Sequence, residues 1–323
     1  MVDQTAIANI TIPNQFPTFH SEILISFIVL IVPTNILIIM AFLSNRHIRS
    51  SQASNFVFAH SLLDLLVGLV LLPCLLAEID ILVLGGMIMY SLLVSLFILA
   101  WSTFDRFVAI CLPLRYENIA TDKRVHRMII SSWLIPVAVV ALPQAWLKGG
   151  DRTTFISKEH RVYLGVVVFG IIATLSVITI AYIRVLLVGL KHLRQQLILR
   201  EFATNWARRL AVEIKFSRMF FMLSLTFFVF WIPTGYMTLT DDVFLLGAPP
   251  KWLQDINFYW IFVSSFLNPV IYAVFHKSYR KTIVVIFLHC RSPGAVVHPI
   301  LDPPPPSAAR RRGRLSTEDD SLW

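Results

Sequence analysis

The amino-acid sequence predicts an all-α membrane protein: a bundle of seven helices that cross a lipid bilayer, followed by one short amphipathic helix. Of the 323 residues, 56% are hydrophobic and only 15% are charged, and the mean hydropathy is +0.71. A soluble domain of this length carries more charge and interrupts its apolar segments more often. The apolar residues here lie in long blocks without strand-like alternation, so helices are the structure expected to satisfy the backbone inside lipid.

Seven apolar blocks define the predicted crossings, at residues 23–43, 55–77, 81–109, 127–147, 162–188, 214–240 and 253–275. Each block is long enough to cross a hydrocarbon core of about 30 Å at 1.5 Å per residue. The fifth and sixth helices are expected to continue into the cytoplasm, because residues 188–213 contain neither proline nor glycine after Gly189. The sequence therefore predicts an N-terminal tail over 1–22 and a bundle of seven crossings over 23–275.

The distribution of basic residues predicts the orientation. Only five of the 28 lysines and arginines fall on the predicted outer side: Lys148, Arg152, Lys158, Arg161 and Lys251. Basic residues collect on the cytoplasmic side of membrane proteins, so we expect a multi-pass plasma-membrane protein with its N-terminus outside and its C-terminus in the cytoplasm. The net charge of +9 then reflects a basic cytoplasmic face, which meets anionic lipids and an acidic partner surface. It does not require a nucleic-acid partner. Asn9-Ile10-Thr11 is a glycosylation sequon, which fits an outer N-terminus.

Residues 276–290 predict the short helix after the seventh crossing. From His276 to Leu288 charged residues come first and apolar residues follow, which is typical of a helix in the membrane interface. Cys290 is predicted to carry palmitate, with an unmodified thiol as the alternative. The three cysteines, Cys74, Cys111 and Cys290, cannot all pair and are predicted at different depths, so we expect no structural disulfide. Residues 291–323 are predicted to form a disordered cytoplasmic tail.

Asp64 lies deep in the second predicted crossing, where an ionisable group is costly and therefore indicates a function. We expect it to have polar neighbours on other helices, namely Asn35, Ser95, Ser264, Ser265 and Asn268. Carboxylate, hydroxyl and amide oxygens together favour a hard cation. The sequence thus predicts a sodium ion at Asp64. The alternative is a protonated carboxyl group held by hydrogen bonds.

Asp105-Arg106-Phe107 ends the third predicted crossing at the cytoplasmic edge, and Glu213 begins the sixth at the same depth. An ion pair between Arg106 and Glu213 would latch the two helices in a resting state, and its loss would shift an equilibrium between two states. The alternative is that Arg106 only extends its charged end to the interface.

Two proline breaks are predicted in the last crossings. The sixth contains Phe227-Phe228-Val229-Phe230-Trp231-Ile232-Pro233, in which Pro233 removes a backbone hydrogen bond and kinks the helix. A bulky Trp231 beside the kink makes a hinge that a ligand could move. The seventh contains Asn268-Pro269-Val270-Ile271-Tyr272, which places Pro269 near Asp64.

These motifs occur in order, one set in each predicted crossing, and with them the chain resembles the rhodopsin-like (class A) G-protein-coupled receptors over about residues 23–290. The matching residues are Asn35, Asp64, Asp105-Arg106-Phe107, Trp133, Tyr182, Phe227 with Trp231-Ile232-Pro233, and Asn268-Pro269-Val270-Ile271-Tyr272. One such motif is weak evidence of kinship, whereas a full set in register is strong.

The resemblance implies roles for these residues. Arg106 would engage a heterotrimeric G protein after the sixth helix moves outward, with Tyr182 and Tyr272 stabilising that state. Asp64, Ser95 and Asn268 match the sodium-site positions of the family, and Trp231 matches the toggle below the ligand pocket. Arrestin and receptor kinases are further partners that the resemblance implies.

The chain departs from the family pattern at its predicted outer end. Ile81 stands where most members have the third-helix cysteine of a disulfide, and residues 148–161 contain no cysteine to pair with it. Thr174 stands in place of a fifth-helix proline, and Phe107 and Phe230 replace a tyrosine and a cysteine. The loss of both the disulfide and the fifth-helix proline is similar to the pattern of the melanocortin, cannabinoid and lysophospholipid receptor branches. It equally fits a divergent lineage or a chemosensory receptor.

The resemblance also bears on the ligand. Ile88 stands where amine receptors have an aspartate, and Phe262 stands where opsins have a retinal-binding lysine, which disfavours both ligands at those positions. The predicted pocket is apolar and suggests a hydrophobic or lipid-like ligand; its lining is Ile88, Met89, Leu92, Trp231, Phe258 and Phe262. The alternative is that these side chains only pack together. Acidic residues on the outer rim are interpreted as solvated rather than as a site for a basic peptide or Ca²⁺: Glu78, Asp80, Asp241, Asp242 and Asp255.

Other classes of function fit less well. A seven-span transporter or channel-like protein without G-protein coupling is the alternative, but the sequence has no inverted repeat. An enzyme is disfavoured because no paired carboxylates, histidine cluster or activated nucleophile is predicted at membrane depth. The sequence therefore predicts a ligand-activated receptor without a cofactor, with Na⁺ as an allosteric ion.

Overall fold

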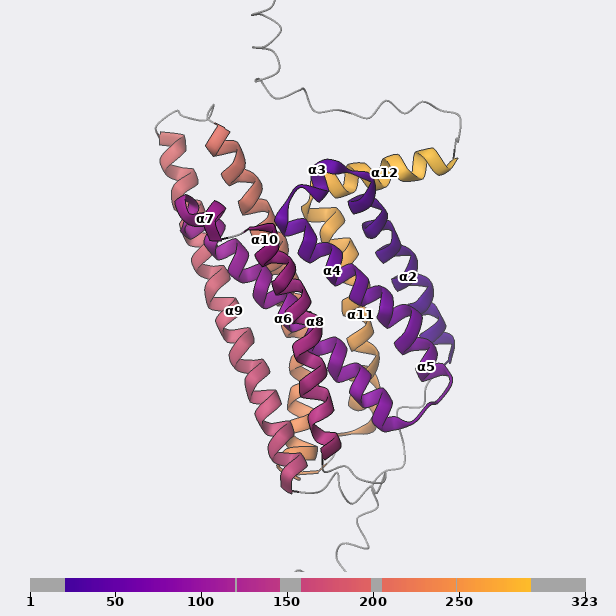
Figure 1. Cartoon of the computed structure of the whole chain (residues 1–323). Helices are drawn as coiled ribbons and strands as arrows, with labels where there is room; N and C mark the ends of the chain where they lie inside the picture. The colour runs from indigo at the N-terminus through magenta and orange to yellow at the C-terminus, as the bar shows by residue number, and fades with distance from the viewer. Residues whose placement is uncertain (1–20, 120, 146–157, 199–204, 248, 292–323) are drawn as a thin grey trace, which may run out of the picture. The chain divides into compact units, whose positions relative to one another are not determined.

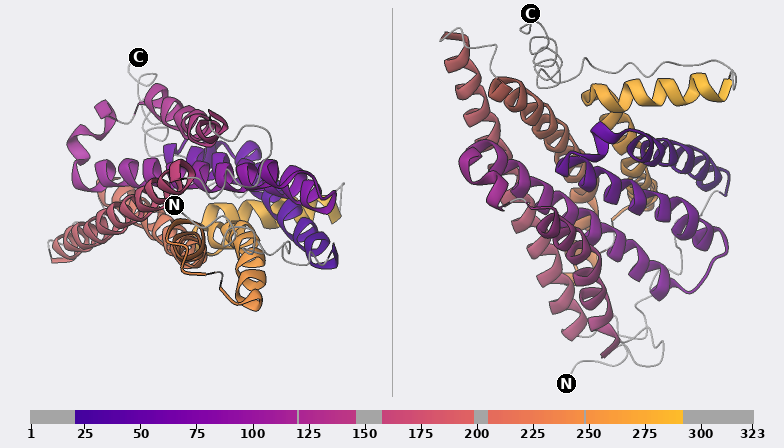
Figure 2. Two further views of the ribbon diagram at one scale, coloured as in Figure 1. Left: turned by 90° about the horizontal axis from the view of Figure 1, so that it is seen from below. Right: turned by 45° about the horizontal axis from the view of Figure 1, so that its top comes forward.

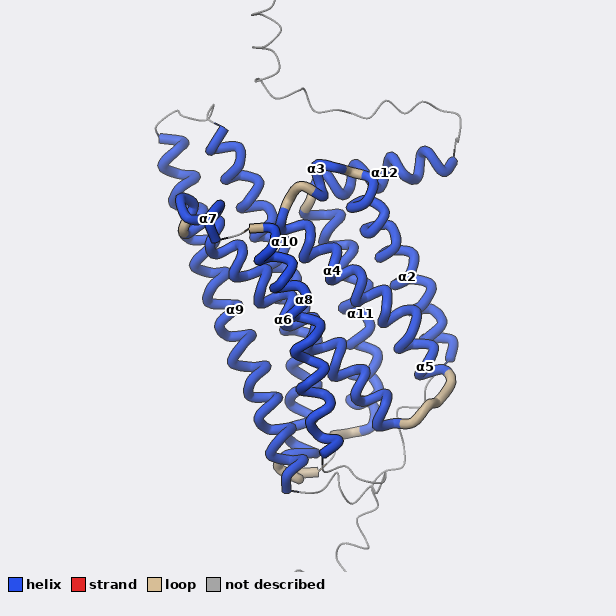
Figure 3. The backbone as a smooth tube through the Cα atoms, viewed as in Figure 1, coloured by secondary structure: helices blue, strands red, loops and turns tan. Residues whose placement is uncertain are grey.

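The computed structural model of the chain describes residues 21–119, 121–145, 158–198, 205–247 and 249–291. Every secondary-structure element in these residues is a helix, and seven crossings are long and apolar enough to span a membrane. The predicted fold class is therefore confirmed (Figures 1 and 3). The chain divides into two units, with the boundary between Thr282 and Ile283, and all seven crossings belong to the first unit.

Each predicted crossing overlaps one observed crossing. In chain order these are α2 (Ser21–Ser44), α4 (Gln52–Leu66) continued by η1 (Val67–Leu71) and α5 (Leu72–Leu76), α6 (Ile81–Cys111), α8 (Asp122–Ala141) continued by η2 (Leu142–Ala145), α9 (Lys158–Ile198), α10 (Asn205–Met237) continued by η4 (Thr238–Val243), and α11 (Lys251–Phe275). Three shorter helices complete the described elements: α3 (Arg46–Arg49), α7 (Pro113–Ile119) and α12 (Lys277–Arg291).

Several helices are longer than the apolar blocks that predicted them. The expected extension of the fifth and sixth helices is confirmed, because α9 continues to Ile198 and α10 begins at Asn205. The fourth crossing begins at Asp122 rather than at residue 127. An acidic residue in the first turn interacts favourably with the helix dipole, which supports helix beyond the apolar block.

A π-helical segment interrupts the second crossing and was not predicted. Pro73 cannot donate a backbone hydrogen bond and its ring crowds the preceding turn, and the wider turn of η1 directly before it accommodates this loss. The same segment contains Gly68, where an added Cβ would lie 2.7 Å from Val32 Cγ2 and 3.2 Å from Ile31 Cγ2. Gly68 therefore allows the second crossing to approach the first closely.

The distribution of polar and apolar side chains in the bundle is that of a protein in lipid. Large apolar side chains such as Val29, Leu134 and Val166 are more than 60% exposed on the outside of the helices. Charged and polar side chains such as Asp64 and Arg106 are buried inside. A water-soluble protein avoids an apolar surface of this extent, so the arrangement fits a surface that faces hydrocarbon.

α6 is the central helix of the bundle. It packs against α4, α8, α9 and α10, while α11 packs against α2, α4 and α10 (Figure 2). Arg106 lies near the end of α6, so we call the end of the bundle at which α6 ends, beside α3 and α7, the Arg106 end. The end at which α6 begins is the opposite end (Figure 1). At the Arg106 end, Tyr279 in the first turn of α12 is fully buried, and Asn45 Nδ2 donates a hydrogen bond to Thr282 Oγ1 at 2.8 Å.

Candidate functional site

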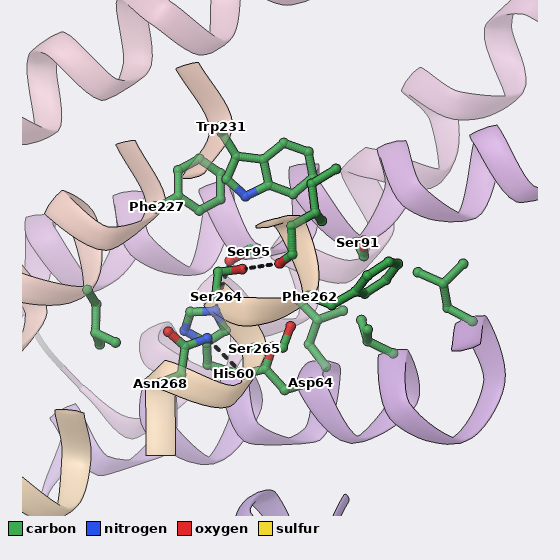
Figure 4. A pocket seen from close by; sticks show the side chains of 15 residues that line it. His60, Asp64, Ser91, Ser95, Phe227, Trp231, Phe262, Ser264, Ser265 and Asn268 are labelled. Atoms are coloured by element: carbon green, nitrogen blue, oxygen red, sulfur yellow. Dashed lines mark hydrogen bonds between the residues drawn. The ribbon is translucent and has the colours of Figure 1, made fainter. Parts of the chain in front are cut away.

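A small polar chamber lies in the middle of the bundle around Asp64. Its volume is about 30 Å³, and its polar lining comes from α4, α6 and α11 (Figure 4): His60, Asp64, Ser91, Ser95, Ser264, Ser265 and Asn268. A cavity of about 10–15 Å³ is enough to hold one water molecule, so the chamber has room for one ion or for one or two waters. The helix spacing explains the convergence, since residues three or four apart share one face.

Asp64 is held by the seventh crossing. Asn268 Nδ2 donates a hydrogen bond of 2.8 Å to Asp64 Oδ2, which links α11 to α4, and both residues are buried. Of the neighbours predicted for Asp64, Ser95, Ser264 and Ser265 line the chamber with it. Asn35 instead donates hydrogen bonds to the backbone oxygens of Ile31 (3.0 Å) and Ser265 (3.4 Å). It joins α2 to α11 without lining the chamber.

The sequence analysis missed His60. This imidazole is 3% exposed and its Nε2 lies 2.8 Å from Ser95 Oγ, which joins α4 to α6 beside Asp64. His60 lies one helical turn before Asp64, so the i to i+4 spacing was a usable signal. With the hydroxyls, the amide and the carboxylate, the chamber combines oxygen ligands suited to a hard cation with one nitrogen.

Arg106 is the centre of a second cluster, at the Arg106 end. Its guanidinium forms ion pairs with Asp105 on the same helix and with Glu213 at the start of the membrane part of α10. The guanidinium carbon also lies 5.6 Å from the centre of the Phe216 ring, within the range of a cation–π contact. Arg106 is 1% exposed and the Glu213 side chain 28% exposed, so the pair is open to solvent only on the Glu213 side.

Tyr116 and Gln52 extend this cluster, and the sequence analysis missed both. The Tyr116 hydroxyl donates a hydrogen bond of 2.8 Å to Gln52 Oε1 and lies 3.3 Å from Asp105 Oδ1. Burial raises the pKa of Tyr116 to about 12, so the hydroxyl keeps its proton at neutral pH. The contact connects α7 to both α6 and α4, and thereby fixes the position of Asp105 beside Arg106.

The remaining residues of the predicted switch lie close to these two clusters, and the first of them, Phe107, is only partly buried. Phe107 packs against Ile110, Val185 and Ile214, where α6, α9 and α10 meet. Tyr182 and Tyr272 are fully buried, with Tyr182 at 6.2 Å from the Phe221 ring and Tyr272 at 6.4 Å from the Tyr279 ring.

The predicted hinge lies beside the polar chamber. Trp231 and Phe227 line it from α10, and their rings stack with centroids 5.7 Å apart (Figure 4). Pro233 follows within the same helix, and the π-helical turn η4 comes after it. Pro269 is buried in α11 next to Asn268. Movement at Trp231 would therefore act directly on the chamber wall.

The residues predicted to line a ligand pocket are packed together for the most part. Ile88 and Phe258 contact the apolar cluster that includes Phe262, and the Phe258 and Phe262 rings meet edge to face at 5.4 Å. Leu92 is buried in α6. Of the six predicted lining residues, Trp231 and Phe262 line the polar chamber. Met89 is partly buried in α6.

Some predicted sites cannot be placed. Asn9, the tail 292–323 and most of the segment 148–161 lie outside the residues that the structure describes, as does the side chain of Cys290. Cys74 and Cys111 are free thiols.

Comparison with known proteins gives a consistent result. The profile of the family described as 7 transmembrane receptor (rhodopsin family) matches residues 34–272. The 5-hydroxytryptamine receptor 4 of Cavia porcellus is 28% identical over 86% of this chain and 83% of its own length. The melatonin receptor type 1C of Gallus gallus is 26% identical over 84% of this chain and 83% of its own length. A rhodopsin, GQ-coupled, of Mizuhopecten yessoensis is 26% identical over 59% of this chain and 42% of its own length.

Proposed function

Because the chain belongs to the rhodopsin family of seven-transmembrane receptors, and is thus a G-protein-coupled receptor, we propose that an extracellular ligand moves α10 outward at the Arg106 end and so admits a heterotrimeric G protein. The observation that carries this proposal is the ion pair between Arg106 on α6 and Glu213 on α10. It joins the central helix to the helix that must move.

The ion pair has the properties of a latch. Arg106 is buried, so losing Glu213 leaves a guanidinium that needs another partner. Asp105 pairs with Arg106 on the same helix and would keep part of that stabilisation when α10 moves, and an acceptor on the G protein would supply the rest. A ligand need only change the relative stability of two existing states, and the G protein selects the open one.

We propose Na⁺ as an allosteric ion in the polar chamber. Asp64 would supply the charge, and Ser95, Ser264, Ser265 and Asn268 would supply neutral oxygens. Three helices would then be tied together by one ion, which favours the compact resting state. His60 differs in kind from these ligands, because its imidazole already engages Ser95.

We propose a hydrophobic or lipid-like ligand for the interior of the opposite end. The 5-hydroxytryptamine receptors among the relatives are named for an amine, but Ile88 supplies no carboxylate for one here. The apolar side chains around Phe262 pack against each other, so a ligand would have to separate them. Phe262 lines the chamber together with Trp231, which gives such a ligand a direct route to the hinge.

Other parts of the proposal follow from the family and the sequence. They are an outer N-terminus glycosylated at Asn9, a palmitoylated Cys290 in α12, a cytoplasmic tail after this helix, and arrestin and receptor kinases as further partners. The chain's relatives are receptors, which favours a non-enzymatic function. The alternative is a transporter or channel-like function without G-protein coupling. It predicts ion currents across membranes that contain the protein and no G protein.

The test is ligand-free nucleotide exchange in membranes that contain the receptor and a panel of heterotrimeric G proteins. Wild-type receptor should accelerate exchange for at least one G protein, and Arg106→Ala should remove this acceleration. Arg127→Ala is the matched control, because Arg127 is an exposed arginine of α8 whose side chain contacts only the Lys123 backbone oxygen among its described contacts. Normal exchange in a well-expressed Arg106→Ala receptor would contradict the mechanism.

A further inference from the structure

The imidazole of His276 lies at the junction of α11 and α12 and contacts α10. Its ring centroid is 4.3 Å from that of Phe216 on α10 and 5.4 Å from that of Tyr279 on α12. His276 Nδ1 is buried and has no hydrogen-bond partner in the part of the chain that the structure describes. A neutral imidazole can pack in this way as an aromatic ring, whereas an imidazolium would leave a charged N–H donor buried without an acceptor.

Phe216 connects this imidazole to the Arg106–Glu213 ion pair. The Phe216 ring is fully buried, and its centroid lies 5.6 Å from the guanidinium carbon of Arg106. Glu213 lies three residues earlier in α10, so the two side chains share one face of the helix. An outward movement of α10 that separates Glu213 from Arg106 must therefore also withdraw Phe216 from His276 and admit water to the imidazole.

The titratable and charged groups around His276 come from four helices and are mostly cationic. They are Lys215 and Glu213 on α10, Arg106 and Asp105 on α6, Tyr272 on α11, and Lys277, Tyr279 and Arg280 on α12. Both carboxylates are paired with Arg106, and α4 carries no charged residue over 52–59. Burial, aided by Lys215, lowers the pKa of His276 to about 4 from its ordinary 6.5. While α10 is in place, a proton on this imidazole therefore finds no free carboxylate among these groups.

We propose that His276 is a proton switch that makes the receptor sensitive to cytoplasmic acidity, because a proton on its imidazole favours the state in which α10 has moved outward. This role rests on the proposed function, in which α10 moves at the Arg106 end and that end faces the cytoplasm. In the resting state the imidazole is neutral and packs against Phe216. In the outward state water reaches the imidazole, so it can bind a proton from the cytoplasm. Acid therefore acts on the same equilibrium as the ligand.

The size of the effect follows from the two protonation equilibria. With α10 in place the pKa of His276 is about 4, and an imidazole fully in water has the ordinary value of 6.5. Between these values the outward state binds a proton that the resting state does not, so a lower pH favours the outward state. A change from about pH 7.4 to about pH 6.0 should raise the ratio of outward to resting receptors roughly fourfold when the outward state leaves the imidazole fully in water.

The proton switch is tested by ligand-free nucleotide exchange with the full chain in lipid nanodiscs, at about pH 7.4 and about pH 6.0. His276→Phe keeps an aromatic ring against Phe216 and cannot bind a proton. The ratio of exchange at the lower pH to exchange at the higher pH should be roughly fourfold larger for wild type than for His276→Phe. This comparison between receptors cancels the pH dependence of the G protein itself. His126→Phe is the matched control, because His126 is an exposed histidine near the start of α8, and it should keep the wild-type ratio.

Two results of this comparison would overturn the proposal. Equal ratios in wild type and His276→Phe would show that the imidazole does not carry the response. Loss of the response in His126→Phe would show that an exposed histidine is enough to explain it. If His276→Phe is poorly folded, His276→Gln replaces it, because glutamine is neutral at both pH values, and the same loss of the response is expected.

A measurement without G protein separates the proton switch from G-protein coupling. Spin labels are attached at the exposed residues Arg127 of α8 and Arg218 of α10, in a full chain whose three cysteines are replaced by alanine. Acidification should increase the population with the longer distance between the labels, and His276→Phe should remove this increase. If no G protein responds to the receptor but the distances shift as expected, G-protein coupling fails and the proton switch stands. Distances that do not depend on pH would overturn the proton switch whatever the exchange measurements show.

Discussion

The imidazole of His60 and the hydroxyl of Ser95 lie 2.8 Å apart across the contact between α4 and α6. His60 Nδ1 is buried and has no hydrogen-bond partner among the described residues. The Ser95 hydroxyl, which the family resemblance assigns to a sodium ion, therefore already contacts the imidazole of His60. This competition should weaken sodium binding at Asp64.

Replacing His60 tests that competition. In His60→Leu the Ser95 hydroxyl is released, so the sodium concentration for half-maximal thermal stabilisation should fall about fivefold, which corresponds to one hydrogen bond of about 1 kcal/mol. The measurement is the ligand-free unfolding midpoint during titration of NaCl against KCl at constant ionic strength. Asp64→Asn should abolish the sodium response with either residue at 60. A response in His60→Leu no stronger than in wild type would refute the competition.

Glu213 provides the test of the latch. Glu213→Ala removes the partner of Arg106 on α10, so ligand-free nucleotide exchange should rise, by roughly fivefold for a partly exposed pair worth about 1 kcal/mol. Glu213→Gln keeps a hydrogen-bond acceptor and should give a smaller increase. Exchange is measured per receptor at the cell surface. Unchanged exchange in a well-expressed Glu213→Ala receptor would mean that the ion pair does not hold α10.

The crossings and the two clusters were accessible from sequence for different reasons. Hydropathy summed over a crossing is a large signal, so the number and order of helices followed from it. The Arg106–Glu213 contact followed from depth, because each residue ends or begins an apolar block at the same membrane edge. Asp64 was conspicuous because a carboxylate among apolar residues is rare and costly.

Features that depend on packing between helices were not accessible. The close approach of Gly68 to Val32 depends on the neighbouring helix, which a single helix does not reveal. His60 could be placed beside Asp64 by spacing, but its partner Ser95 depends on how α4 and α6 rotate. An apolar residue such as Phe258 can equally line a cavity or pack against Phe262, and composition does not distinguish the two.

Gly189 sets the distance between α9 and α10 near the latch. A Cβ at this position would lie 3.1 Å from Ile214 Cγ1, and Ile214 is the neighbour of Glu213. Gly189→Leu should push α10 away from α9 and raise ligand-free nucleotide exchange. Gly170→Leu on the same helix is the control, since an added Cβ there meets nothing within 4 Å. Equal exchange in the two well-expressed variants would show that this contact does not position α10.

His276, between α11 and α12, makes the stability of the bundle depend on pH. Its ring lies 4.3 Å from Phe216 and 5.4 Å from Tyr279, and burial, aided by Lys215, lowers the pKa of His276 to about 4 from its ordinary 6.5. Between these values the unfolded chain binds a proton that the folded chain does not. The stability is therefore complete above pH 6.5 and falls as the pH is lowered towards 4.

His276→Phe removes this titration and keeps an aromatic ring against Phe216. The protein is held in lipid nanodiscs, and the pH is lowered from neutral to about 5, which lies between the unfolded and folded pKa values of His276. The unfolding midpoint of His276→Phe should then fall less than that of wild type. His126→Phe is the control, because His126 is exposed on α8 and its replacement should leave the wild-type pH dependence intact. If both variants lose as much stability as wild type on acidification, the proton-linked loss arises elsewhere in the bundle, and folding does not lower the pKa of His276.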